Sequence, residues 1–151
     1  MANRPFHKGG FTLYSGFQLR TTIPARGILA CMKVFLAHAS DFDFRNKLYI
    51  PIRHSPLNSE FEFFFPQESE KEEVTKELIR GMNVLLVDVS RPSTGAGIEM
   101  GWANAFSVPI IAMHEKGSSV SSSVDHVAKE HIEYIGPEEM IEKLTQVLQG
   151  L

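Results

Sequence analysis

Hydrophobic and polar residues follow one another along the chain in short blocks that predict alternating strands and helices. Short apolar runs predict five strands, over residues 34–37, 61–65, 84–89, 109–113 and 131–135. Apolar positions at helical spacing predict three helices, over residues 68–81, 97–106 and 137–149. Residues 41–50 predict a weak helix or a loop that ends near Pro51.

This alternation predicts an α/β fold. Residues 84–89 contain the run VLLV, which is typical of a strand buried on both faces of a parallel sheet. Strands separated by helices imply right-handed crossovers, so we expect a flavodoxin-like or Rossmann-like sheet of five parallel strands with helices on both faces. Ligands of such sheets bind beyond the carboxyl ends of the strands, which places the chemistry on the loops after residues 37, 65, 89 and 113.

The start of the chain differs from the rest. Residues 1–31 contain glycines, prolines and scattered positive charges and hold neither strand nor helix periodicity for long. We interpret them as an N-terminal extension, with a disordered tail as one possible form. Residues 32–151 are then one domain, and a chain of 151 residues is long enough to bury a core without metals or disulfides.

Composition and charge narrow the classes of function. The net charge of -3 offers no basic surface, so long nucleic acid is not an expected partner. No apolar run approaches the roughly 20 residues that span a bilayer, so no membrane association is expected. Cys31 is the single cysteine and fits a reducing cytoplasm. The six histidines form no H-E-x-x-H motif, so we expect neither a metal nor any other cofactor.

The glycine-rich stretch RPSTGAGIEMG, residues 91–101, is the clearest candidate site. A dinucleotide fingerprint fails because Gly95, Gly97 and Gly101 are spaced one residue too widely and follow the third strand instead of the first. A P-loop fails because no Gly-Lys-Ser/Thr follows. Glycines at a strand-to-helix turn still allow close approach of a ligand, and the amides at a helix start favour an anion, with Ser93 as an added hydroxyl donor.

Glu99 is the only carboxylate in this stretch. The predicted helix places it in the first turn, where the helix dipole favours its ionised form. An ordinary first-turn glutamate that faces water is the simpler interpretation. Against it, Ile98, Met100 and Trp102 leave few wet positions around Glu99, so a carboxylate in apolar surroundings is a site candidate.

Residues 83–113, NVLLVDVSRPSTGAGIEMGWANAFSVPIIAM, resemble the core of the nucleoside 2-deoxyribosyltransferase-like family. The resemblance is greatest to its 2'-deoxynucleoside 5'-phosphate N-hydrolases and is strong over residues 83–124. The shared pattern is an apolar strand ending in an acidic residue, a Pro-Ser-x-Gly-x-Gly-x-Glu-x-Gly turn, a helix that contains alanine, and a strand. The turn is fairly specific because it places glycines, a hydroxyl and a carboxylate together.

The resemblance implies a glycosyl-transfer site. Glu99 matches the nucleophile that attacks the anomeric carbon, and water or a second base then resolves the glycosyl-enzyme. Ser93 matches the hydrolases, whereas the transferases of free nucleosides have an aspartate there, so a 5'-phosphate is implied; Gly95 and Gly97 line the same seat. Ser122, in GSSVSSSV, matches a second phosphate contact that reaches the neighbouring subunit, which implies a homodimer. Without the family, this serine-rich segment would be interpreted as a flexible surface loop.

Two residues that accompany the nucleophile in this family are absent from the matching positions of this sequence. Phe35 replaces a tyrosine of the first strand, and Thr75 stands where counting back from Asn83 places an aspartate. Nearby acids are candidates to substitute for that aspartate: Asp88, which we select as the second catalytic residue, and Glu72 or Glu77. After the first strand, HASDFD offers three further contacts for phosphate or base beside Phe35: His38, Ser40 and Asp41.

The sequence therefore predicts a cytoplasmic enzyme that hydrolyses or exchanges the N-glycosidic bond of a nucleoside 5'-monophosphate. One alternative is a nucleotide-binding sensor with little or no turnover, and another is a 2-deoxyribosyltransferase that acts on free nucleosides. A third is a Toll/interleukin-receptor-like domain that cleaves NAD, because VFLAHASDFD resembles the opening of that fold. The Pro-Ser-Thr-Gly-Ala-Gly-Ile-Glu turn disfavours the third alternative.

Overall fold

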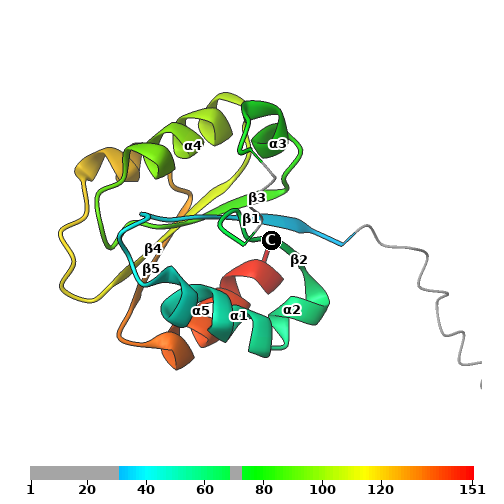
Figure 1. The fold of residues 1–151 in the computed structure, drawn as a ribbon, viewed down its shortest axis with the longest axis vertical. Coiled ribbons are helices and arrows are strands. Elements are labelled where there is room, and N and C mark those ends of the chain that lie inside the picture. The colour runs from blue at the N-terminus through cyan, green and yellow to red at the C-terminus, as the bar shows by residue number, and fades with distance from the viewer. Residues whose placement is uncertain (1–30, 69–72) are drawn as a thin grey trace, which may run out of the picture.

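Five parallel strands form the centre of the molecule in the order β2-β1-β3-β4-β5 (Figure 1). The structure is a computed structural model that describes residues 31–68 and 73–151. The strands are β1 (Lys33–Ala37), β2 (Glu62–Phe64), β3 (Val84–Asp88), β4 (Ile110–Glu115) and β5 (Glu130–Tyr134). The helical segments are η1 (Arg45–Tyr49), α1 (Ile50–His54), α2 (Leu57–Glu60), α3 (Lys76–Arg80), α4 (Thr94–Ala105), η2 (Ser122–His126) and α5 (Pro137–Gln149).

Helices cover both faces of the sheet (Figure 1). Because side chains alternate along a strand, Leu85 and Val87 of β3 pack under α3 and α4, whereas Val84 and Leu86 pack with α1 and α5 on the other face. Every residue of β3 is buried, as expected for a central parallel strand. The predicted α/β class, with a five-stranded parallel sheet and helices on both faces, is confirmed.

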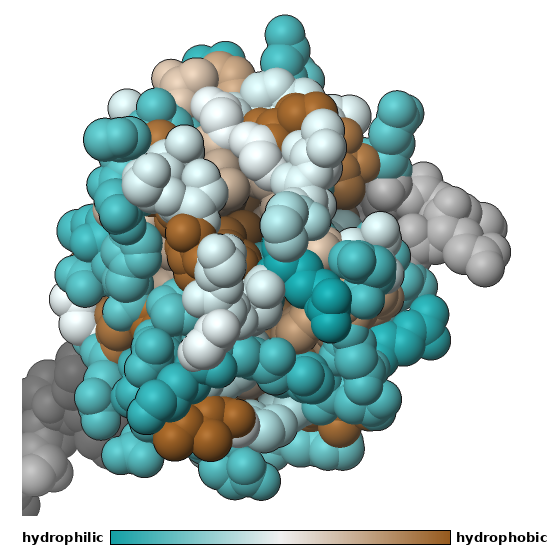
Figure 2. Space-filling model, turned by 90° about the vertical axis from the view of Figure 1, so that its left-hand side faces the viewer, coloured by the Kyte–Doolittle hydropathy of each residue, from teal (hydrophilic) through white to brown (hydrophobic). Residues whose placement is uncertain are grey.

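The strand order determines where a ligand can bind. In a 2-1-3-4-5 sheet the crossovers leave β1 and β3 toward opposite faces, and ligands of such sheets generally bind beyond the carboxyl ends of these two strands. The loop after β1 and the loop between β3 and α4 meet at this point. Figure 2 looks onto this edge, where the surface is mostly polar and separate apolar patches lie between the polar side chains.

Several predicted boundaries differ from the structure. Helix α4 begins at Thr94, three residues before the predicted start, because Ser93 caps it. The helical segment does not end at Pro51: η1 is followed directly by α1, which has Pro51 in its first turn, a position that proline tolerates.

Other predictions concern segments that the structure describes only in part. Of the helix predicted over 68–81, the structure shows only α3, Lys76–Arg80: residues 68, 73–75 and 81 are not helical, and residues 69–72 lie outside the described residues. The proposed extension of residues 1–31 also lies outside them, except for Cys31. Among the helices of the described segments, none is both long enough and apolar enough to cross a bilayer.

Thr75 starts α3. Its hydroxyl oxygen accepts a hydrogen bond from the Leu78 amide at 3.2 Å, so it satisfies one of the amides that a helix leaves unpaired at its start.

We expect Thr75→Ala to lower the free energy of unfolding by about 1 kcal/mol, because an alanine cannot accept that bond. Thr94→Ala is the matched control, since Thr94 is the first residue of α4 and its helix is capped by Ser93. Urea denaturation of both variants measures the difference. Equal stabilities of the two variants would contradict a capping role for Thr75.

Candidate active site

The turn between β3 and α4 is built around Ser93. Its hydroxyl oxygen accepts a hydrogen bond from the Ala96 amide at 3.2 Å, and its carbonyl accepts one from Gly97 at 3.0 Å. The Ser93 hydroxyl hydrogen remains available to donate to a ligand. The amides of Thr94 and Gly95, at the first turn of α4, point out of the helix toward the same place, which suits an anion.

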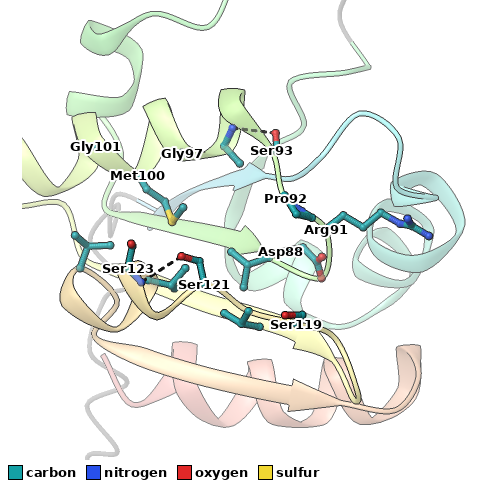
Figure 3. Close-up of a pocket in the computed structure, with 15 residues that line it drawn as sticks. Asp88, Arg91, Pro92, Ser93, Gly97, Met100, Gly101, Ser119, Ser121 and Ser123 are labelled. Carbon is teal, nitrogen blue, oxygen red and sulfur yellow. Dashed lines mark hydrogen bonds between the residues drawn. The ribbon is translucent and has the colours of Figure 1, made fainter.

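A cavity of about 600 Å³ lies beside α4 (Figure 3). One wall is α4, with Gly97, Met100 and Gly101, and the facing wall is the segment before and within η2, with Ser121 and Ser123. Apart from the adjacent residues and the backbone of the helix itself, no atom of the described residues comes within 4 Å of the position that a Cβ would take on Gly97 or Gly101, so this side of the helix is open to an occupant. Apolar side chains line most of the remainder: Val89, Ala96, Val120, Val124 and Val127.

Glu99 lies on α4, but it is not one of the described residues that line this cavity. Its side chain is half-buried, and burial raises its pKa to about 7. No hydrogen bond to its carboxylate occurs within residues 31–68 and 73–151. Because α4 begins at Thr94, Glu99 is in the second turn, so the prediction of a first-turn glutamate kept ionised by the helix dipole is wrong: desolvation dominates.

His38 follows β1 and is almost fully buried. Its Nδ1 donates to the Ala39 carbonyl at 3.0 Å, so Nε2 of the neutral ring accepts from the Tyr49 hydroxyl at 2.6 Å. The Tyr49 oxygen in turn accepts from the Gln67 amide at 3.4 Å. Burial lowers the pKa of His38. Both ring nitrogens are therefore occupied, and the predicted contact of His38 with a phosphate or base does not match this arrangement.

A second cavity, of about 460 Å³, opens at the carboxyl ends of β1 and β2. Arg45, Tyr49, Ile50 and Glu68 line it. The charges of Glu68, Glu99 and Arg45 all act on the Tyr49 hydroxyl: after desolvation, the two carboxylates raise its pKa and the guanidinium lowers it. Glu99 is therefore electrostatically linked to this second cavity.

Asp88 ends β3 and is buried at the border of the larger cavity. Its carboxylate accepts from the Tyr134 hydroxyl at 2.6 Å and from the Ser90 amide at 3.0 Å. Burial raises its pKa, and these hydrogen bonds oppose that rise. Tyr134 belongs to the core on the α5 face of the sheet, opposite to α4. This carboxylate therefore anchors β3 to β5, and the prediction that Asp88 assists Glu99 conflicts with its bond toward the other face.

Of the remaining predicted residues, the structure brings some to the site and places others away from it. Phe35 is fully buried under α4 and stacks on Phe64 with ring centroids 5.4 Å apart, so it is core and cannot contact a substrate directly. Ser40 and Asp41 are exposed on the loop after β1 and line neither cavity.

Gly95 and Ser122 are exposed. Gly95 lies in the first turn of α4, and Ser122 begins η2 between two serines that line the larger cavity. Of the candidate substitutes for the missing aspartate, Glu77 is exposed beside Lys76, and Glu72 lies outside the described residues.

Sequence reasoning missed four residues that shape this edge: Arg45, Tyr49, Glu68 and Tyr134. The two tyrosines carry buried hydroxyls in apolar surroundings, and a buried hydroxyl needs a partner. Tyr134 could have been found from the period-two pattern of β5, in which Ile132 and Tyr134 are buried. Nothing in the weak pattern of residues 41–50 identified Tyr49.

The fold and site define a flavodoxin-like α/β protein with a half-buried carboxylate on α4, the helix that follows the central strand β3. A solved structure, Clostridium botulinum CMP N-glycosidase BcmB, is 22% identical with a TM-score of 0.57, covering 76% of this chain and 98% of that one. A conserved protein from Enterococcus faecalis V583 is 14% identical with a TM-score of 0.58, covering 78% and 99%. These likenesses concern the fold. The sequence matches no protein-family model and no curated protein.

We expect Glu99 to make stability depend on pH. An unfolded glutamate titrates near pH 4.3, so between there and pH 7 the folded state binds more protons and the free energy of unfolding falls as pH rises. Glu99→Gln should flatten this fall and be more stable than wild type above pH 7, by on the order of 3 kcal/mol at most. Urea denaturation at several pH values tests this, with the exposed Glu77→Gln as control. Parallel pH profiles of wild type and Glu99→Gln would contradict the raised pKa.

Proposed function

We propose that this protein cleaves the N-glycosidic bond of a nucleoside 5'-monophosphate with Glu99 as the nucleophile. The observation that carries the proposal is the environment of Glu99: a half-buried carboxylate on α4, the helix that follows β3, whose pKa burial raises to about 7. The Clostridium botulinum protein of similar fold is named as a CMP N-glycosidase, an enzyme that cleaves such a bond. The Pro-Ser-Thr-Gly-Ala-Gly-Ile-Glu turn agrees with the same chemistry.

In this reaction a Glu99 oxygen forms a bond to the anomeric carbon while the bond from that carbon to the base breaks. The electron pair leaves with the base, which takes up a proton. Water then attacks the glycosyl-enzyme, releases the sugar 5-phosphate and regenerates the carboxylate; a second base in place of water gives base exchange. Desolvation favours the attack, because the ionised carboxylate has little water to lose.

The phosphate fits the start of α4. The Ser93 hydroxyl hydrogen and the amides of Thr94 and Gly95 are donors at one place, and a carboxylate at position 93 would repel the dianion. Glu99 lies only one helical turn further along α4. A free nucleoside would leave these donors without a partner, which favours the monophosphate over the transferase substrate.

We expect Glu99→Gln to lower base release from the accepted monophosphate by at least about 10³-fold, because the amide cannot form the glycosyl-enzyme. The variant keeps size and shape, so monophosphate binding by calorimetry should persist. In wild type, kcat/KM should fall below about pH 7, where Glu99 becomes protonated. Glu77→Gln is the matched control. Equal rates for wild type and Glu99→Gln, or tight monophosphate binding without any product, would reject the proposed enzymatic activity. Tight binding without product would favour a nucleotide-binding sensor.

The proposal includes a homodimer that pairs through α4. A twofold interface places the same surface against itself, so charges on it would repel their copies. The solvent-facing positions of α4 carry no charge, and Ile98 is 49% exposed next to the apolar cavity. Exposed Ser122 at the start of η2 could then approach the site of the other copy.

We expect Ile98→Glu to shift the protein from dimer to monomer in light scattering, because the substitution places two carboxylates together at the interface. Ile135→Glu, at a side chain 72% exposed beyond β5, should stay a dimer. A monomeric wild type, or dissociation of both variants alike, would reject this interface.

A further inference from the structure

The side chains that line the smaller cavity differ in character from the hydrogen-bond donors at the start of α4. It combines one cation, Arg45, one anion, Glu68, an aromatic ring, Tyr49, and an aliphatic side chain, Ile50. The ring of Tyr49 is held rigidly, edge-on to Phe65 at 4.8 Å between centroids and tied to His38 through its hydroxyl. The cavity is therefore a preformed recess with hydrogen-bonding groups of both kinds at its mouth.

This lining disfavours a phosphate and suits a neutral ring. A dianion would face the Glu68 carboxylate, which repels it. Arg53 pairs with Glu68 through two nitrogens and offsets part of its charge, but each carboxylate oxygen still has a free acceptor position. A ligand that offers a hydrogen-bond donor to Glu68 and an acceptor to Arg45 satisfies both, and nucleobases carry donors and acceptors on one edge.

The position of the recess also suits a base. Tyr49 lines the recess, and the charge of Glu99 on α4 helps to raise the pKa of the Tyr49 hydroxyl, so Glu99 is close enough to act on the recess without lining it. With the sugar at Glu99, as in the proposed function, the recess is the cavity in which we place the base.

We propose that the recess formed by Arg45, Tyr49, Ile50 and Glu68 binds the nucleobase, and that Glu68 selects bases with an exocyclic amino group over their oxo counterparts. This inference rests on the proposed function. An amino group donates to the Glu68 carboxylate, while Arg45 donates to the neighbouring ring acceptor. An oxo group at the same place would put an acceptor against a carboxylate, which leaves both without a partner.

The experiment compares kcat/KM for amino and oxo pairs, CMP against UMP and AMP against IMP, in both ribo and 2'-deoxy forms. Wild type should favour the amino member by at least about 10-fold. Glu68→Gln should bring this ratio close to one, because an amide can both donate and accept. Arg53→Gln is the matched control: it breaks the same ion pair but leaves the Glu68 carboxylate, so it should keep the amino preference.

A parallel measurement separates this inference from the proposed function. Calorimetry on Glu99→Gln protein, with and without Glu68→Gln, gives the affinity ratio for CMP over UMP without turnover. If no substrate releases its base, the proposed reaction fails, and the affinity ratio still decides how the recess selects. An amino preference that Glu68→Gln leaves unchanged, or that Arg53→Gln abolishes equally, would overturn the role of Glu68.

Discussion

The direction of the crossovers on either side of β1 and β3 is the constraint on which the site depends. The chain leaves β1 toward the face of α1 and leaves β3 toward the face of α4, so no connection covers the edge between the two strands. His38 and Ser93 lie on the segments that follow these two strands, and Glu99 lies further along α4.

Burial shifts the pKa of three ionisable groups at this edge, and the groups differ in what compensates for the burial. The pKa of His38 is lowered by burial, and both of its ring nitrogens are hydrogen-bonded. Asp88 is equally buried, but a tyrosine hydroxyl and a backbone amide stabilise its charge. Glu99 has neither compensation within the described residues, so its proton is held up to about pH 7. A bound substrate can change the surroundings of a carboxylate that has no hydrogen-bond partner more easily than those of a paired group. This difference distinguishes Glu99 from His38 and Asp88.

The sequence was sufficient for the sheet, because apolar runs such as VLLV have few alternatives to a buried parallel strand. It was sufficient for the β3–α4 turn too, although it underestimated Ser93, which starts the helix early. It failed where tertiary burial sets the chemistry: the ionisation of Glu99 depends on what covers α4, and the partner of His38 comes from a segment with a weak pattern. The sequence could have predicted which face of the sheet Asp88 points to: it follows Val87 on the same strand, so its side chain points to the opposite face.

Phe35 and Thr75, which stand where the resemblance would place a tyrosine and an aspartate, both have structural roles. The Phe35 ring stacks on Phe64 beneath α4, in a layer without polar atoms where a hydroxyl would need a partner. The Thr75 hydroxyl oxygen caps α3 by accepting the hydrogen bond of the Leu78 amide. Both side chains therefore have structural roles, and the charged groups that act on the same tyrosine hydroxyl as Glu99 come instead from η1 and from the segment after β2.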